Sequence, residues 1–421
     1  MFHKRLILMA TVTPLFVSQA FAGGLERGGY SIDQLFDTET FSFSTTGTYV
    51  TPQRRLRNAV DTDPSDGLGS DGMGGGTTST DDTTDYVVAR FGIKLGIVDS
   101  VDCLFDYGQP WGADTNPGPN WVGANFNIET QFDSNNFSAT CSYKFDAGPG
   151  QLRFLGGGSY QEISGFRDRL VAPPIPALGT SGIGSLNLAD SGHGWRVGVA
   201  YEIPEIAFRT SLVYNSQIDF GNLRGDVDLT EIPSVINPSS PFLGRVTPVF
   251  GNVTMPQTLE LKMQSGIAPD WLAFGSVKWV DWSVLQTVTL CPLSTRGLAS
   301  CTFNSPTKLT SIDLLFRDGW TLTGGVGHKF NDLVSGAIQL NYDRRTSTGI
   351  NTFTDTWTVS AGAVVAPNDR LEFRAAGTLG ILTSGSSGRV ERNGNVFGDD
   401  VSYSFNDDFV GAFQLAARVR F

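Results

Sequence analysis

Four arginines stand in segments where charged and apolar residues alternate with a period of two. They are Arg90, Arg153, Arg196 and Arg209. A guanidinium group binds a carboxylate through two parallel hydrogen bonds, so each arginine is a candidate partner for an acidic ligand. The alternative is that these cations form structural ion pairs with acidic side chains on the same faces. The sequence leaves both interpretations open.

Residues for acid–base or nucleophilic catalysis are scarce. His193 and His328 are the only histidines after His3, and neither belongs to a recognisable catalytic motif. Such chemistry usually needs a positioned base, most often histidine, so an outer-membrane enzyme is a disfavoured alternative. The aspartate-rich stretch 54–84 lacks the spacing of a calcium loop, and no pattern indicates a zinc site. We expect no cofactor and no metal.

The four cysteines suit an oxidising compartment. Cys291 and Cys301 lie in one short stretch and are predicted to form a disulfide within a loop. Cys103 and Cys141 lie in strand-like segments and could bridge neighbouring strands. Disulfides are favoured over a metal site because these spacings do not match those of zinc ligands.

Strands are the elements that would position these side chains, and the end of the chain shows this most clearly. From Phe409 to Phe421, apolar residues alternate with residues that include Gln414, Arg418 and Arg420. Successive side chains of a strand point to opposite faces, so one face suits lipid and the other a wet lumen. A helix would scatter both arginines into the apolar stripe. A soluble β-sandwich could also end on such a strand.

The start of the chain favours a membrane barrel. Residues 1–22 are predicted to be a cleaved signal peptide, with a basic start, an apolar run and Ala20-Phe21-Ala22 at the cleavage site. The run is too short to span a membrane, and no run of about eighteen apolar residues follows it. Only helices and closed barrels satisfy their backbone in lipid. We therefore expect the protein in the outer membrane of a Gram-negative cell.

The expected fold is all-β: a transmembrane antiparallel β-barrel of about 14 strands over residues 41–421. Tight turns alternate with long loops, which we expect at 54–84, 108–134, 165–193, 217–254, 283–319 and 383–408. Outer-membrane barrels keep short turns in the periplasm and long loops outside, so both termini should lie in the periplasm. Residues 23–40 have no strand period and suit a segment packed inside the barrel.

Charge and surface character limit the partners. The net charge of −12 makes nucleic acid an improbable partner. The apolar outer faces of the strands would contact outer-membrane lipid and lipopolysaccharide. We expect the barrel to be a monomer.

Three stretches together resemble the FadL family of outer-membrane transporters for long-chain fatty acids and other hydrophobic molecules. Residues 255–283 resemble the family's central hairpin, and residues 316–320 resemble the entry to the strand after it. Residues 107–115, with Pro110-Trp111-Gly112, resemble its third strand at the point where that strand breaks. The order and spacing of the three stretches make the resemblance specific.

The resemblance implies that an N-terminal hatch, residues 23–40, fills the lumen. The apolar side chains of that hatch would be Leu25, Ile32, Leu35 and Phe36. It also implies that a hydrophobic ligand leaves sideways through a gap in the third strand. The gap would lie at Gly108, Pro110 and Trp111, because proline has no N–H for the ladder and glycine weakens a strand. The family's hatch is longer and usually contains Asn-Pro-Ala, which this chain lacks.

Apolar residues in two long loops form a candidate ligand entrance on the outside of the cell. They are Leu170, Val171, Ile175 and Leu178 in the third loop, and Ile232, Val235, Ile236, Phe242 and Leu243 in the fourth. The alternative is that these side chains pack on one another and cap the barrel. The expected ligand is a hydrophobic small molecule. A general diffusion porin, with a polar open lumen and no plug, is the second alternative function.

Overall fold

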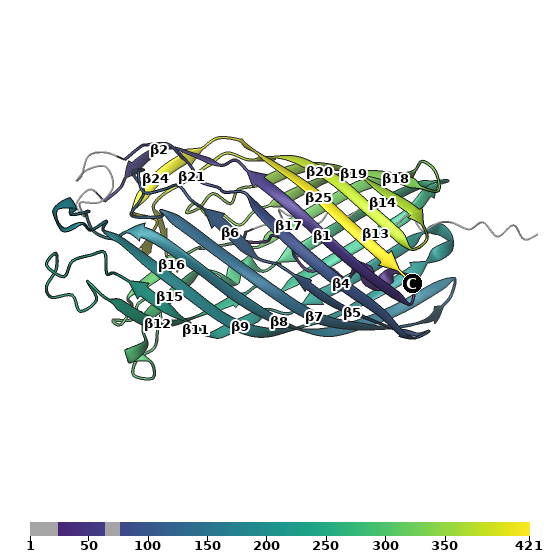
Figure 1. Ribbon diagram of the computed structural model, residues 1–421, viewed down its shortest axis with the longest axis horizontal. Coiled ribbons are helices and arrows are strands. Elements are labelled where there is room, and N and C mark those ends of the chain that lie inside the picture. The colour runs from purple at the N-terminus through teal and green to yellow at the C-terminus, as the bar shows by residue number, and fades with distance from the viewer. Residues whose placement is uncertain (1–23, 64–75) are drawn as a thin grey trace, which may run out of the picture.

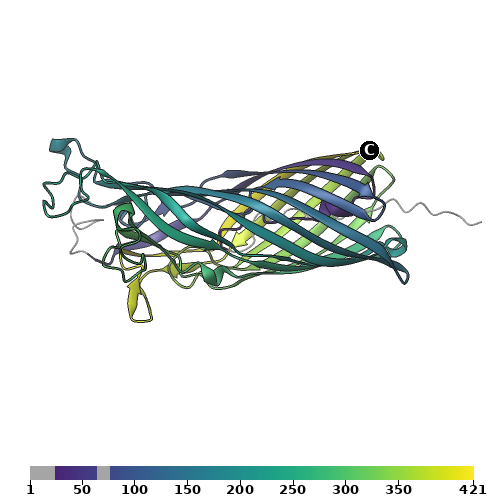
Figure 2. The ribbon, with the colours of Figure 1, turned by 90° about the horizontal axis from the view of Figure 1, so that it is seen from below.

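The computed structural model describes residues 24–63 and 76–421. The predicted signal peptide, residues 1–22, lies outside these residues. The described chain forms a long cylinder of tilted strands, with loops gathered at one end and the C-terminus at the other (Figure 1). Figure 2 shows the same division from a second direction. We call the two ends the loop end and the turn end.

Fourteen strands of the described residues close into an all-β antiparallel barrel. In ring order they are β1 (Phe41–Pro52), β4 (Tyr86–Val98), β5 (Val101–Gly108) continued by β6 (Gly112–Thr115), β7 (Glu129–Ala147), β8 (Gly150–Leu170), β9 (Ile183–Ile203), β10 (Phe208–Asn215) continued by β11 (Ile218–Asp228), β12 (Val246–Met255) continued by β13 (Thr258–Ala268), β14 (Trp271–Val280) continued by β15 (Thr287–Pro292), β16 (Thr310–Asp313) continued by β17 (Gly319–Lys329), β18 (Val334–Arg344), β19 (Thr356–Asn368), β20 (Leu371–Leu382) and β25 (Asp408–Arg420). No helix in the described part of the chain is both long and apolar enough to cross a bilayer.

The barrel closes between its first and last strands. β1 pairs antiparallel with β25, and Phe41 and Phe421 exchange backbone hydrogen bonds of 3.0 and 2.9 Å. Along β25, Phe409 and Phe413 are 70% and 50% exposed, whereas Gln414 and Arg418 are buried. The predicted apolar outer face and polar inner face of this strand are therefore confirmed.

Aromatic side chains form an outward belt towards the loop end. The rings of Trp195 and Tyr214 lie 5.2 Å apart, and those of Tyr342 and Trp357 lie 4.6 Å apart. Trp320 is exposed at the corresponding level of β17. Tryptophan and tyrosine prefer the boundary between lipid and water, so the belt marks where the wall leaves the hydrocarbon. β9 continues beyond this belt, from Trp195 back to Ile183.

Several predicted loop boundaries are wrong, because the strands extend past the belt. β8 and β9 occupy most of the expected loop 165–193, and β11 and β12 occupy much of the expected loop 217–254. The other long connections also contain short strands, including β15 and β16. Beyond the belt the outer face meets water instead of lipid, so the alternation that identifies a membrane strand is lost.

A smaller sheet packs at the loop end. It consists of β2 (Arg55–Asp61), β3 (Thr80–Asp81), β21 (Gly385–Ser387) and β24 (Val401–Phe405). Between β21 and β24 the chain forms a separate hairpin of β22 (Val390–Arg392) and β23 (Asn395–Phe397). Leu56 and Phe405 of this sheet are buried and pack in one cluster with Trp121. Disulfides join Cys291 of β15 to Cys301 in the following loop, and Cys103 of β5 to Cys141 of β7.

Residues 24–40, the N-terminal segment, lie inside the ring of strands. Asp33 pairs with Lys262 of β13 at 3.1 Å, and Glu26 pairs with Lys278 of β14. Asp37 pairs with Arg420 of β25 at 2.8 Å. The segment contains one short 3-10 helix, η1 (Asp33–Phe36). Contacts with strands from different sides of the ring hold it across the lumen.

Candidate functional site

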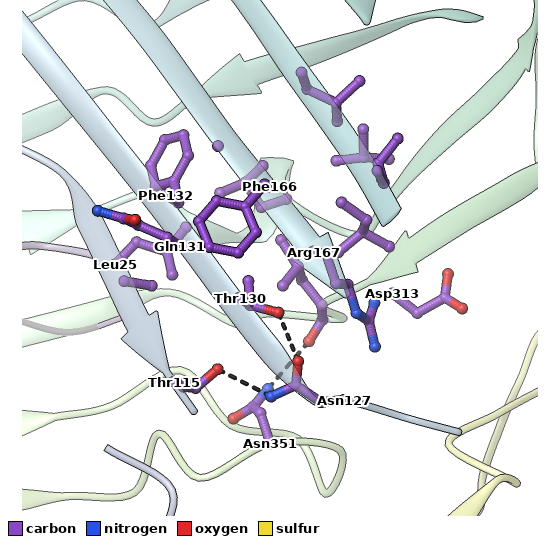
Figure 3. A pocket seen from close by; sticks show the side chains of 18 of the residues that line it. Leu25, Thr115, Asn127, Thr130, Gln131, Phe132, Phe166, Arg167, Asp313 and Asn351 are labelled. Carbon is purple, nitrogen blue, oxygen red and sulfur yellow. Dashed lines mark hydrogen bonds between the residues drawn. The ribbon is translucent and has the colours of Figure 1, made fainter. Parts of the chain in front are cut away.

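An apolar cavity of about 220 Å³ lies in the loop-end half of the barrel. Figure 3 shows Phe132 of β7 and Phe166 of β8 beside Leu25 of the N-terminal segment. Leu188 of β9 and Leu285 complete other parts of the lining. A cavity of about 150 Å³ is known to hold benzene, so this space suits one ring or a segment of hydrocarbon chain.

One polar corner interrupts this apolar lining. Arg167, Asp313 and Asn127 line this corner (Figure 3). The Arg167 guanidinium donates to the backbone oxygen of Phe126 and lies 5.2 Å from the ring of that residue. Among the described residues, Arg167 Nε and Asp313 Oδ1 are buried without a hydrogen-bond partner. A polar group on a mainly apolar ligand could bind at this corner.

The wall of the barrel is interrupted where β5 ends. Arg90 of β4 pairs with Gly108, and farther along the same two chains Thr83 pairs with Thr115. Six residues separate these pairs on each side, 84–89 and 109–114, so the register is the same above and below the interruption. No residue is inserted, and the chain between Gly108 and β6 simply leaves the ladder. We call this break in the strand pairing between β4 and β5/β6 the window.

The N-terminal segment takes over the hydrogen bonds that β4 does not make at the window. The backbone N–H groups of Arg27 and Gly28 donate to the carbonyls of Pro110 and Gln109 at 2.9 and 3.0 Å. Gly112 N donates to the carbonyl of Leu25 at 2.8 Å. A buried backbone group without a partner would be costly, so the displaced chain is stable only while the segment lies against it.

Arg27 occupies the space beside the window. Its guanidinium pairs with Asp114 of β6 and, at 3.2 Å, with Asp133 of β7. The same group lies 4.2 Å from the centre of the Tyr86 ring on β4. Arg27 therefore contacts both edges of the interruption.

The four arginines predicted as carboxylate partners are engaged by the protein itself. Arg90 donates to the carbonyls of Gly28 and Gly29, and Arg153 pairs with Asp102 at 2.9 Å. Arg196 donates hydrogen bonds to the side chains of Asn215 and Thr140. The guanidinium carbon of Arg209 lies 4.4 Å from the centre of the Phe36 ring. None of the four lines the apolar cavity, and Arg167, which was not predicted, does.

Most of the predicted entrance residues pack inward. Ile232 is fully buried, and Val171, Phe242 and Leu243 pack against the same core, while Leu170 packs on the cluster around Trp121. Ile175 forms an isolated bridge with Thr180. Leu178, Val235 and Ile236 remain exposed. None of the nine residues lines the cavity, and five of them pack into neighbouring hydrophobic clusters.

The apolar side chains predicted for the hatch occupy two places. Leu25 lines the cavity, whereas Ile32, Leu35 and Phe36 pack against Leu104, Leu155, Ala200 and Val213 on the inner face of the wall. A second cavity, of about 150 Å³, lies beside the segment and is lined by charged groups that include Arg90, Lys262 and Arg418. The lumen therefore changes from apolar to charged along the barrel.

Sequence reasoning missed the cavity, although one signal for it exists. On β8 the inward positions change from Arg153 and Gln161 to Ile163, and on β9 Leu186 and Leu188 follow the same inward face. Leu186 and Leu188 fall in the stretch 165–193, which was expected to be a loop. Reading them as strand would have shown an apolar inner face beyond the belt.

The part of the chain that the structure describes contains no group of three or more histidine, cysteine, aspartate or glutamate side chains placed to hold a metal ion. Asp82, between β3 and β4, borders the cavity. Burial raises the pKa of this carboxyl to about 6, although a hydrogen bond from Thr352 and the charge of Arg54 oppose the shift.

The closed antiparallel wall, its lipid-facing outer side chains and its aromatic belt define a β-barrel of the outer-membrane class. The model of one family, described as outer membrane protein transport protein (OMPP1/FadL/TodX), matches residues 34–378. The chain belongs to this family, and it is an outer-membrane transport protein. The resemblance to FadL is thereby confirmed. A family of transport proteins also agrees with the expectation that the chain is not an enzyme.

Solved structures of low sequence identity share the fold. A Pseudomonas aeruginosa FadL homologue aligns with a TM-score of 0.74 and 17% identity, over 96% of this chain and 97% of that one. The Pseudomonas putida toluene transporter TodX aligns with a TM-score of 0.58 and 14% identity, over 95% and 96%. The CymD monoaromatic hydrocarbon channel aligns with a TM-score of 0.58 and 13% identity, over 92% and 90%. A search of the curated proteins finds no match.

Proposed function

We propose that this protein carries hydrophobic molecules, such as long-chain fatty acids or similar hydrocarbons, across the outer membrane. The ligand occupies the apolar cavity and then leaves sideways through the window into the bilayer. One observation carries this proposal: the cavity adjoins the window, because Leu25 and Ala113 line the cavity beside the displaced chain. Structurally similar proteins include a toluene transporter and a monoaromatic hydrocarbon channel.

The charged part of the lumen favours a sideways exit over passage along the barrel axis. On the other side of the N-terminal segment, an apolar ligand would meet Arg90, Lys262 and Arg418. Leaving the apolar cavity for water costs roughly 0.8 kcal/mol for each CH₂ group. Release into the bilayer avoids this cost, and the window opens towards the lipid-facing wall.

The N-terminal segment acts in this proposal as the hatch. Its contacts with β7, β13, β14 and β25 block the axis, which favours a plugged transporter over a general diffusion porin. The loop end faces the outside of the cell, and both termini lie in the periplasm. The outer surface contacts lipid and lipopolysaccharide, and the closed barrel works as a monomer.

Filling the cavity tests the proposal. Leu188→Trp places a larger side chain in the lining, whereas Val197→Trp places the same side chain on the exposed outer face of the same strand. We expect Leu188→Trp to weaken binding of palmitate and toluene at least about tenfold, a change of about 1.4 kcal/mol, and Val197→Trp to leave binding unchanged. The measurement is equilibrium binding of each radiolabelled compound to the protein in lipid nanodiscs, corrected for empty nanodiscs. Wild-type protein that binds neither compound would contradict the proposal.

A further inference from the structure

A further hollow, which we call the outer hollow, lies at the loop end, and exposed residues such as Asn252 line it. It has a volume of about 430 Å³ and is lined by polar side chains, including Asn252 and Gln286, together with the rings of Phe303 and Phe397. The hairpin β22–β23 borders it, and Arg392 Nη1 of that hairpin donates to Gln286 Oε1 at 2.6 Å. The Cys291–Cys301 disulfide fixes the loop on its other side, with Cys301 in the lining.

This hollow lies where the wall between β12 and β15 is irregular. Phe250 pairs with Cys291, and the next regular pair towards the turn end is Thr258 with Val280. Seven residues, 251–257, therefore face ten residues, 281–290, and the two chains cannot keep one register across this stretch. β15 instead pairs with β16 on its other side.

Three aliphatic side chains are shared by the linings of the outer hollow and the apolar cavity. Val253, Leu285 and Val288 line both spaces, and we call these three the partition. Leu285 is 2% and Val288 is 8% exposed, so the partition is closed. The side chains of valine and leucine have no hydrogen bonds to lose, and opening the partition therefore requires only changes of rotamer and packing.

We propose that the ligand enters the cavity through this partition, from the hollow between β12 and β15. This port rests on the proposed function, and it assigns the entrance to a part of the wall distinct from the predicted entrance loops. An apolar molecule binds weakly in the polar hollow, and it binds better in the cavity behind Leu285, because the lining there is apolar. The window at β5 and the port at β12 are then the exit and the entrance of one path.

Blocking the hollow with a bulky group tests the port. All four native cysteines are in disulfides, so the thiol of Asn252→Cys is the one that fluorescein maleimide can label. Asn252 is exposed in the hollow and does not line the cavity. The matched control is Ser239→Cys, which is exposed in the predicted entrance loop. The readout is the initial rate of palmitate and toluene uptake by cells that express each variant, with and without label.

We expect labelled Asn252→Cys to take up both compounds at least about fivefold more slowly than the same variant without label, and labelled Ser239→Cys to be unaffected. An unchanged rate in labelled Asn252→Cys would overturn the port, and loss of uptake in labelled Ser239→Cys would assign the entrance to the predicted loop. Leu285→Ala, which thins the partition, should raise the uptake rate without any label, and an unchanged or lower rate would also count against the port. If the unlabelled variants take up no more than cells lacking the protein, the proposed function itself fails.

Discussion

At the scale of single residues, buried charges determine how the loop end is held together. Arg54 is 2% exposed and donates to Asp408 at 3.2 Å and to Thr354 at 3.1 Å. Asp82 is also buried, and it accepts a hydrogen bond of 3.2 Å from Thr352. These contacts tie together loops that are far apart in the sequence. Because burial outweighs the hydrogen bond from Thr352 and the charge of Arg54, the ionised form of Asp82 is less stable in the folded protein than in water.

Asp82 should therefore make the stability of the protein depend on pH. Its pKa is about 6 in the folded protein against an ordinary value of 3.8, so the folded state favours the protonated carboxyl. The contribution of the Asp82 carboxyl to the free energy of unfolding is fully present below pH 3.8. It is lost as the pH rises through 6. Between pH 5 and 7.5 we expect a loss of about 1 kcal/mol. Thermal unfolding at both pH values should show a smaller loss in Asp82→Asn, and an identical loss in the two proteins would contradict this account.

At the scale of elements, the N-terminal segment and the window depend on each other. The chain at Pro110 leaves the ladder with β4, and residues 25–28 supply the hydrogen bonds that the ladder would have supplied. Ion pairs from Glu26 and Asp33 to the far wall hold the segment in that place. The segment is therefore the partner of the displaced strand, and in the proposed function it also plugs the lumen.

Removing residues 24–40 should open the lumen. We expect the deletion variant to conduct ions several-fold better than the intact protein in planar bilayers, because the charged walls would then enclose a continuous aqueous path. The β-sheet circular dichroism and the heat-modifiable mobility of the variant show whether its barrel is folded. Large conductance in the intact protein, or no increase in a folded deletion variant, would argue that the segment does not plug the barrel.

The sequence and the structure agree best where one strand carries its own pattern. The alternation from Phe409 to Phe421 predicts β25, and repeated alternation predicts the number of strands. The cavity is different, because its lining comes from β7, β8, β9 and later loops, and no local pattern links Phe132 with Leu285. Gly108 and Pro110 mark the break in the third strand. They do not reveal that residues 25–28 replace the lost partner, because that contact joins distant parts of the chain.

At the scale of the whole molecule, the barrel combines an apolar interior at the loop end with a charged interior towards the turn end. Leu25 stands at this change, next to the window, and Arg27 contacts both edges of the window. An apolar molecule in the cavity therefore has lipid on one side and charged groups on the other. The central claim is that it leaves through the wall.

Restoring the wall at the third strand tests this claim most directly. The register is equal on both sides of the window, so Gly108→Val with Pro110→Thr could pair with β4 without inserting a residue. A Cβ atom at Gly108 would lie 3.6 Å from the Arg90 guanidinium carbon, which is ordinary contact. The measurement is uptake of palmitate and toluene by cells that express the double variant, with folding checked by heat-modifiable mobility. We predict that uptake falls at least about tenfold while equilibrium binding to the purified protein is kept, and undiminished uptake by the folded double variant would contradict lateral release.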